Sequence, residues 1–107
     1  MTQKINYVLG VILNSVKDEV AFLKKDRGPE YLVGKYNYMG GKMEPDESAQ
    51  VAVARETTEE CGLVIPFGRW WLFAIYKCAE YNLFKYVTDC PTISEARPVE
   101  PEEVFVK

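Results

Sequence analysis

The sequence contains no histidine, and this absence excludes several common kinds of active site. Histidine is the usual general base of enzymes, the usual activator of serine and cysteine nucleophiles, and the commonest ligand of zinc. Any catalysis by this chain must therefore use carboxylates, lysines or a hard metal ion.

Cysteine is also scarce. The three cysteines, Cys61, Cys78 and Cys90, are odd in number and include no C-x-x-C pair. This argues against a disulfide framework and against a zinc site built from thiolates. We expect reduced, mostly buried thiols.

Long apolar runs and an excess of positive charge are missing as well. Apolar runs such as residues 7–13 and 70–76 are far shorter than the ~20 residues of a membrane-spanning helix. The first residues lack the pattern of a secretory signal. With 13 basic and 16 acidic residues, the net charge of -3 attracts neither nucleic acid nor an anionic membrane. The sequence therefore predicts a cytoplasmic protein with no membrane partner, and it disfavours polymeric nucleic acid.

What is present is typical of an ordinary globular protein. The 107 residues are 48% hydrophobic and 27% charged, which suits one domain over residues 1–107 with a single core. Nothing in the composition argues against a homo-oligomer.

The first third of the chain predicts a β-hairpin. Residues 7–13 form a continuous apolar run, as in a strand buried on both faces, and residues 19–24 form its partner. A loop over residues 25–35 then leads into a short run, 36–39, which Gly40 and Gly41 are expected to break.

The clearest predicted element is a helix over residues 48–61. It contains no glycine or proline, it is rich in alanine and glutamate, and Gly62 stands where a helix-ending glycine is favoured. A long loop is expected over residues 89–101. The apolar segments 63–67, 70–78 and 81–88 predict strands, and residues 104–106 begin another apolar stretch.

Three glutamates share one face of this helix near its C-terminal end. At 100° per residue, Glu56 and Glu60 lie within about 40° of each other, with Glu59 about 60° to one side of Glu56. Like charges at this spacing repel, and acidic groups are unfavourable at the negative end of a helix. A hard divalent cation with oxygen ligands, best magnesium, would compensate them. The alternative is a solvated helix face.

The wider spacing favours the metal site. Gly41, Glu47, Arg55-Glu56, Glu59-Glu60 and Gly62-Leu63 fit the pattern G-x5-E-x7-R-E-U-x-E-E-x-G-U. On these residues the sequence resembles the Nudix, or MutT-type, hydrolases. Thr57 departs from the pattern, because the family prefers a bulky aliphatic residue there, and we expect slightly weaker packing at this position.

The resemblance implies a fold and an activity. The fold is an α/β/α sandwich with a mixed β-sheet. Family members continue beyond the position of Val106 into another long helix, so we expect a fold shortened at the C-terminus: either that layer is missing, or a partner subunit, another element or a truncation of the chain accounts for it. The activity is magnesium-dependent hydrolysis of a phosphoanhydride bond in a nucleoside diphosphate derivative. We expect a nucleoside triphosphate, oxidised or not, to yield monophosphate and pyrophosphate. ADP-ribose, dinucleotide polyphosphates, capped RNA and a non-catalytic nucleotide-binding module are the alternatives.

The resemblance also implies roles for single residues. Glu56, Glu59, Glu60 and the Gly40 carbonyl would hold Mg²⁺, with Mn²⁺ as the alternative ion. The structural residues of the motif would be Gly41, Glu47, Arg55 and Gly62, with Glu47 and Arg55 paired.

The general base stays open at this point. It is either Glu56 or Glu103, with Glu100 and Glu102 as substitutes. The cluster of Glu100, Glu102 and Glu103 also suits a solvated acidic loop.

Three residues are candidates for substrate binding. Asn37 matches an asparagine with which Nudix enzymes that clear oxidised nucleotides bind the base, although it also suits a turn at the end of a strand. Lys42 and Arg27 either contact phosphate or are surface cations. Trp70 and Trp71 alternate along a predicted strand, so one of them is expected in the core.

Overall fold

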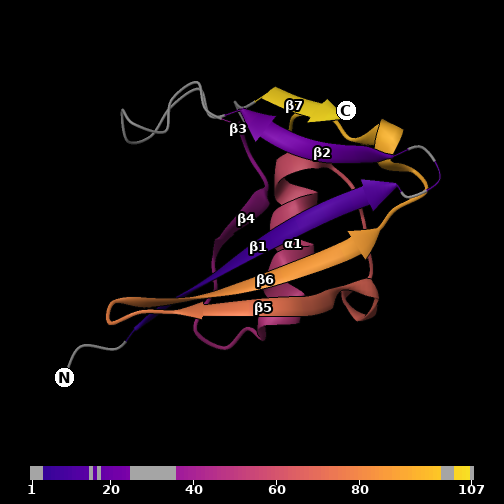
Figure 1. Ribbon diagram of the computed structural model, residues 1–107. Helices are drawn as coiled ribbons and strands as arrows, with labels where there is room; N and C mark the ends of the chain where they lie inside the picture. Colours follow the sequence, from indigo (N-terminus) through magenta and orange to yellow (C-terminus); the bar gives the residue numbers. More distant parts are fainter. Residues whose placement is uncertain (1–3, 15, 17, 25–35, 100–102, 107) are drawn as a thin grey trace.

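The computed structural model describes residues 4–14, 16, 18–24, 36–99 and 103–106. It contains one α-helix, two short 3-10 helices and seven strands within these ranges (Figure 1). In chain order the elements are β1 (Ile5–Asn14), β2 (Glu19–Lys24), β3 (Tyr36–Asn37), β4 (Met39–Lys42), α1 (Ala49–Cys61), η1 (Phe67–Arg69), β5 (Trp71–Lys77), β6 (Tyr81–Asp89), η2 (Ile93–Glu95) and β7 (Glu103–Val106).

The strands form a mixed sheet in the order β3-β2-β1-β6-β5, in which β4 also pairs with β1 and β7 with β2. The central strand β1 runs parallel to β6 and antiparallel to β2 and β4. The predicted N-terminal hairpin is confirmed, although β1 and β2 share only the pairs Leu13↔Val20 and Asn14↔Glu19. Strands β5 and β6 confirm the predictions over 70–78 and 81–88 and form an antiparallel hairpin.

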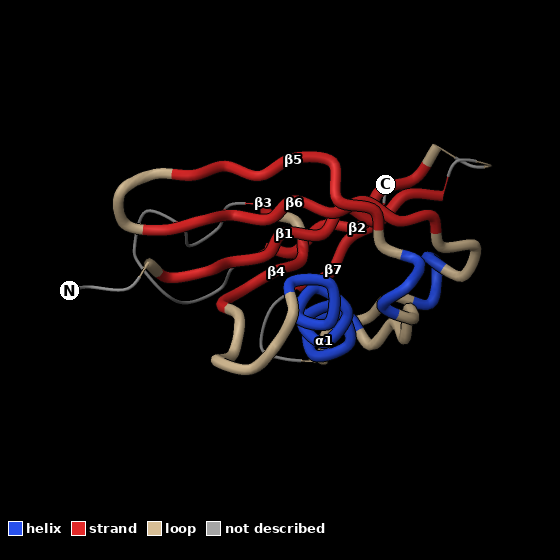
Figure 2. Tube along the Cα trace, turned by 90° about the horizontal axis from the view of Figure 1, so that it is seen from below, coloured by secondary structure: helices blue, strands red, loops and turns tan. Residues whose placement is uncertain are grey.

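Helix α1 forms where the sequence predicts it. The Ser48 hydroxyl accepts a hydrogen bond from the Val51 N–H at 3.3 Å. At the other end Gly62 adopts the left-handed φ of 77° and donates its N–H to the Thr58 carbonyl, which ends the helix. The helix buries Ala52 and Val53 against the sheet, mainly against β4 and β1 (Figure 2).

The departure from the motif at Thr57 is accommodated within the helix. Thr57 is fully buried, and its hydroxyl donates to the Val53 carbonyl at 2.8 Å. The buried oxygen therefore has a partner, and burying this polar group without one would be costly. The β-branched side chain packs at a position where the family prefers an aliphatic residue.

The two faces of the sheet differ in burial, which corrects one prediction. Along β1, Val8, Gly10 and Ile12 are buried towards α1, whereas Leu9 and Val11 on the other face are only partly buried. The strand was expected to be buried on both faces. Among the described residues only one side of the sheet is covered by an α-helix (Figure 2), so the second face keeps some solvent contact.

Two other local predictions are wrong. Residues 63–67 do not form a strand: Pro66 has no N–H for a strand ladder, and η1 follows it, although Leu63 and Ile65 are buried in the core. The two glycines, Gly40 and Gly41, do not end a strand either, because β4 continues through both of them and pairs with β1. The predicted loop over 89–101 also contains η2, whose Ile93 is fully buried.

No helix in the described part of the chain is both long and apolar enough to cross a membrane. The expected fold class is confirmed: a mixed sheet carries the motif helix on one face, and strand β4 lies directly beside that helix.

Candidate active site

The acidic end of α1 is tied to strand β4 by a hydrogen bond. The Gly40 N–H donates to Oε1 of Glu60 at 2.7 Å, and Glu60 is only 5% exposed. A bond from a neutral N–H to a carboxylate is charge-assisted and stronger than one between neutral groups. This contact holds the helix and the strand at a fixed separation.

The next residue of β4 packs against a second glutamate. A Cβ atom on Gly41 would lie 2.6 Å from the carboxyl carbon of Glu56, closer than real contacts of this kind. Glycine is therefore required here for the close approach of strand and carboxylate. At Gly40 a Cβ would meet the Val8 carbonyl oxygen at only 2.2 Å, so this position also excludes a side chain.

Gly41→Ala is expected to displace the Glu56 carboxylate while the chain still folds. The atom that a new Cβ would strike is the end of a flexible side chain, whereas at Gly40 it is backbone. We therefore expect a loss of stability of about 1 kcal/mol for Gly41→Ala and of about 2–3 kcal/mol for Gly40→Ala, measured by urea unfolding. Equal losses in the two variants would contradict this reading of β4.

Arg55 connects the loop before the helix to the acidic cluster. Its Nε and Nη2 atoms form a bidentate pair with Glu47, at 2.6 Å and 2.8 Å. Its Nη1 atom donates to Glu56 at 3.0 Å and to Glu59 at 3.1 Å, and Nη2 also donates to the Lys42 carbonyl at 3.2 Å. One guanidinium thus fixes three carboxylates and one backbone oxygen, which only the planar fork of arginine can do.

These bonds shift the ionisation of both partners. The hydrogen bond from Arg55 holds the pKa of Glu47 below its ordinary value of 4.5, against the opposing effect of burial. The bond to Glu47 is likewise the largest cause of a raised pKa for Arg55. Both groups therefore stay charged at neutral pH.

Glu56, Glu59 and Glu60 lie at the same end of α1 but do not converge on a single point. Glu56 and Glu59 share Nη1 of Arg55, whereas Glu60 turns to Gly40. Accordingly, within the described ranges no three His, Cys, Asp or Glu side chains are arranged as a ready metal site. The separation is consistent with the repulsion of like charges.

The donor set nevertheless suits magnesium. The three carboxylates and the backbone of β4 supply only hard oxygen donors, and the side chain of Glu59 is 45% exposed and has room to turn. The three carboxylates lie at the negative end of α1, whose last turn carries no basic residue. Arg55, one turn earlier, is a cation that binds Glu56.

Beside the glycine strand lies an open hollow of about 520 Å³. Asn37 and Tyr38 line it, together with Gly40 and Gly41 of β4. Two tyrosines that we did not predict as site residues, Tyr7 of β1 and Tyr81 of β6, line it as well, with ring centroids 5.8 Å apart. The alternation of residues along the predicted strands did not indicate either tyrosine, because the two come together only through the parallel pairing of β1 with β6.

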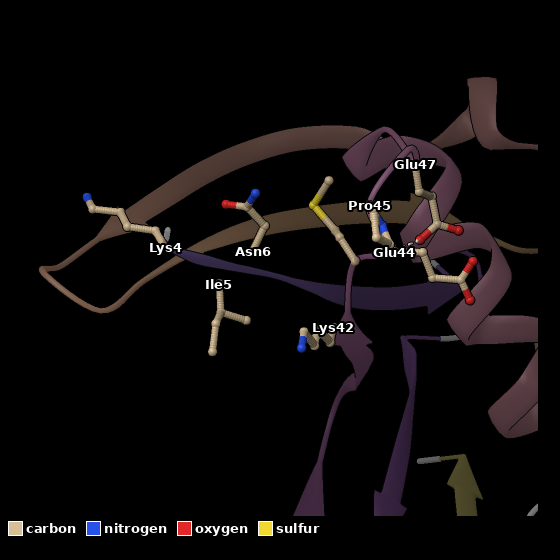
Figure 3. Close-up of a pocket in the computed structure, with 8 residues that line it drawn as sticks. Lys4, Ile5, Asn6, Lys42, Glu44, Pro45 and Glu47 are labelled. Carbon is tan, nitrogen blue, oxygen red and sulfur yellow. Dashed lines mark hydrogen bonds between the residues drawn. The ribbon is translucent and has the colours of Figure 1, made fainter. Parts of the chain in front are cut away.

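Lys42 lines a second, polar cleft of about 440 Å³ next to the loop that precedes α1. Figure 3 shows the carboxylates of Glu44 and Glu47 on the helix side of this cleft and the amines of Lys4 and Lys42 away from them. The Lys42 carbonyl is bound by Arg55, whereas its side chain has no ion pair in the described part of the chain. A lysine in this position can meet an anionic group of a ligand.

The remaining predicted site residues are placed only in part. Arg27, Glu100 and Glu102 lie outside the described residues. Glu103 begins β7 and pairs with Lys24 of β2. On the opposite edge of β2, Lys24 pairs with Tyr36 of β3. At a strand spacing of about 4.8 Å, the backbone of Glu103 lies about 10 Å from the segment that carries Asn37.

Comparison with known proteins agrees with this geometry. The family model described as the NUDIX domain matches residues 5–106. A protein named 8-oxo-dGTP diphosphatase from Buchnera aphidicola subsp. Schizaphis graminum (strain Sg) is 29% identical over 76 residues, which cover 71% of this chain and 52% of that protein. The match thus spans about half of that relative's length.

Solved structures share the fold. A MutT structure from work on Aliivibrio salmonicida and Vibrio cholerae superposes with a TM-score of 0.80 at 23% identity, covering 98% of this chain and 80% of that one. A MutT/nudix family protein from Enterococcus faecalis gives 0.81 at 19% identity, covering 99% and 44%. A MutT NUDIX hydrolase from Burkholderia pseudomallei gives 0.77 at 23% identity, covering 99% and 82%.

Proposed function

Because this chain belongs to the Nudix family, we propose that it is a hydrolase that cleaves a nucleoside triphosphate, oxidised or not, to monophosphate and pyrophosphate. The observation that carries the proposal is the contact between β4 and the acidic end of α1. Gly40 binds Glu60 and Gly41 leaves space for Glu56. The backbone of the same two glycines lines a hollow large enough for part of a nucleotide.

Glu56, Glu59, Glu60 and the Gly40 carbonyl would hold Mg²⁺, with Mn²⁺ as the alternative. When bound, the ion neutralises charge on the phosphate oxygens and lowers the pKa of an attacking water. The chain's own contribution is positional: Arg55 fixes Glu47 in the loop and orients Glu56 and Glu59 on the helix.

The reaction requires a base beside the attacking water. In our proposal Glu56 or Glu103 accepts the proton of that water, whose oxygen attacks one of the two phosphorus atoms joined by the α–β bridging oxygen. The bond from the attacked phosphorus to the bridging oxygen breaks, and the other product leaves with that oxygen. Glu100 and Glu102 are substitutes for the base.

The hollow beside β4 would receive the nucleoside. Tyr7 and Tyr81 offer aromatic surface, and the amide of Asn37 can both donate to and accept from a base edge. Lys42, and Arg27 outside the described residues, would contact phosphate. The name of the Buchnera relative supports an oxidised guanine nucleotide as the first compound to test. The three free cysteines suit a reducing compartment, which we take to be the cytoplasm.

The decisive experiment is a nucleotide panel with products identified by mass. We expect Mg²⁺-dependent release of pyrophosphate from one or more nucleoside triphosphates and loss of the reaction with a chelator. ADP-ribose, dinucleotide polyphosphates and capped RNA belong in the same panel as rival substrates. A chain that binds nucleotides but turns none over would be a non-catalytic module and would overturn the proposal.

A variant distinguishes base recognition from a structural role of Asn37. Asn37→Ala is expected to raise KM for the preferred base by about 10-fold and to leave kcat nearly unchanged, so that discrimination between bases falls. An equal loss of kcat/KM for every base would instead indicate that Asn37 has a structural role in β3.

A further inference from the structure

Two cavities follow each other along the segments that contain β1 and β4. Consecutive stretches of these segments line them: residues 7–9 and 37–41 the hollow beside β4, and residues 4–6, 42–45 and Glu47 the polar cleft of Figure 3. Tyr7, the first hollow residue of β1, pairs with Lys42, the first cleft residue after Gly41. The border between the two cavities therefore falls at the same level on both strands.

The acidic end of α1 reaches β4 at this border. The carboxylate of Glu56 lies against Gly41, the last residue of β4 that lines the hollow. About 13 Å of strand separates Leu9 in the hollow from Ile5 in the cleft, which suits the two ends of one extended nucleotide. A nucleotide with its nucleoside in the hollow would hold its first phosphate at the border, beside Glu56, and extend its outer phosphates into the cleft.

The charges of the cleft that remain without a partner are positive. Arg55 binds Glu47 at 2.6 Å and 2.8 Å, and the carboxylate of Glu44 lies 3.9 Å from the same guanidinium. Lys4 and Lys42 have no ion pair within the described ranges, and their amines point away from the two carboxylates (Figure 3). Two ammonium groups are thus available to an anionic ligand.

Asn6 adds a neutral donor to the cleft. Its Oδ1 accepts a hydrogen bond from Nδ2 of Asn82 at 2.9 Å, which leaves the NH₂ group of Asn6 without a partner in the described part of the chain. Amine and amide donors suit phosphate oxygens. Among the described residues that line the cleft none is aromatic, so it offers a second nucleobase no surface for stacking.

We propose that the polar cleft binds the two outer phosphates of a nucleoside triphosphate and that Lys4 recognises the terminal one. The inference rests on the proposed function and narrows it, because the group that leaves is then pyrophosphate and not a second nucleoside. Lys42, at the border, meets the phosphate next to the bond that breaks. Lys4, at the far end, is the specificity-determining residue, since only a third phosphate reaches it.

Titration calorimetry with inorganic pyrophosphate in the presence of Mg²⁺ tests the cleft without turnover. The wild type should bind pyrophosphate, and Lys4→Gln should weaken the binding about 10-fold, as expected for the loss of one charged hydrogen bond. Lys4→Arg keeps the charge and should bind nearly as tightly as the wild type. A nucleoside monophosphate, which does not reach the cleft, should bind Lys4→Gln and the wild type equally.

Lys85→Gln is the matched control. Lys85 of β6 pairs with Leu9 and Ala74 and lines neither the hollow nor the cleft, so this variant should bind pyrophosphate like the wild type. Equal weakening by Lys85→Gln and Lys4→Gln would show that only the overall charge matters and would overturn the assignment of the cleft.

Kinetics separates this inference from the proposed function. With the triphosphate that the nucleotide panel selects, Lys4→Gln should raise KM about 10-fold and leave kcat nearly unchanged. A panel without turnover would overturn the proposed function and this inference with it. Turnover of a triphosphate with the same KM and the same pyrophosphate affinity in Lys4→Gln as in the wild type would overturn this inference alone.

Discussion

Glu60→Gln is expected to lower the rate of Mg²⁺-dependent pyrophosphate release at least about 100-fold, the largest effect of any single change in this chain. Glutamine keeps the size of the side chain and can still accept the Gly40 N–H, but it removes the negative charge that a hard cation requires. The loss should therefore be in kcat, and it should not be restored by more nucleotide.

Stability should not follow activity in this variant. Glu60 lies within one helical turn of Glu56 and Glu59, so removing its charge relieves repulsion at the negative end of α1. The neutral amide also makes a weaker bond with the Gly40 N–H, so the two effects oppose each other and we expect a melting temperature close to that of the wild type. Glu95→Gln, on an exposed residue of η2, is the matched control and should change neither property. Full activity of Glu60→Gln would show that the metal ligands are wrongly assigned.

Arg55→Met is expected to cost the fold about 2–4 kcal/mol in free energy of unfolding, the largest stability effect that we predict for a side chain of the site. The variant leaves the carboxylate of Glu47, whose side chain is 9% exposed, and that of Glu56, 15% exposed, without the guanidinium that binds them. Arg55→Lys should lose less stability than Arg55→Met, because lysine keeps the positive charge although it lacks the planar guanidinium group. Urea unfolding measures both.

The same pair predicts a pH dependence. The pKa of Glu47 is lowered in the folded state, so its contribution to stability is present above the ordinary value of 4.5 and is lost as pH falls through the folded pKa. Arg55→Met should remove that part of the acid sensitivity. Arg97→Met, at an exposed site, is the control and should stay within about 0.5 kcal/mol of the wild type at every pH. Equal losses from both arginines would contradict a structural role specific to Arg55.

The parts of the site that were predictable from sequence are local ones. Helix α1, its cap at Ser48 and its end at Gly62 follow from residues within a few positions of one another. The same is true of the spacing that places Glu56, Glu59 and Glu60 on one face. The family pattern extended this to Gly41 and Glu47, which lie before the helix.

The parts that were not predictable depend on distant contacts. Two glycines in succession predict a break in a strand, and only the approach of Val8 and Glu56 explains why β4 needs them. The hollow beside β4 depends on the parallel pairing of β1 with β6, between residues more than 70 positions apart. Residues 63–67 were mistaken for a strand because their apolar side chains are anchors in the core, not members of a ladder.

The contrast between two adjacent tryptophans has a practical consequence. Trp70 is 3% exposed and packs beside Gly10 and Val53 in the core, whereas its neighbour Trp71 is 74% exposed on the free edge of β5. The chain thus carries two fluorophores one residue apart in opposite surroundings. Emission from the shielded indole reports on unfolding, and quenching of the solvated one by a small solute reports on whether the outer strand has been covered.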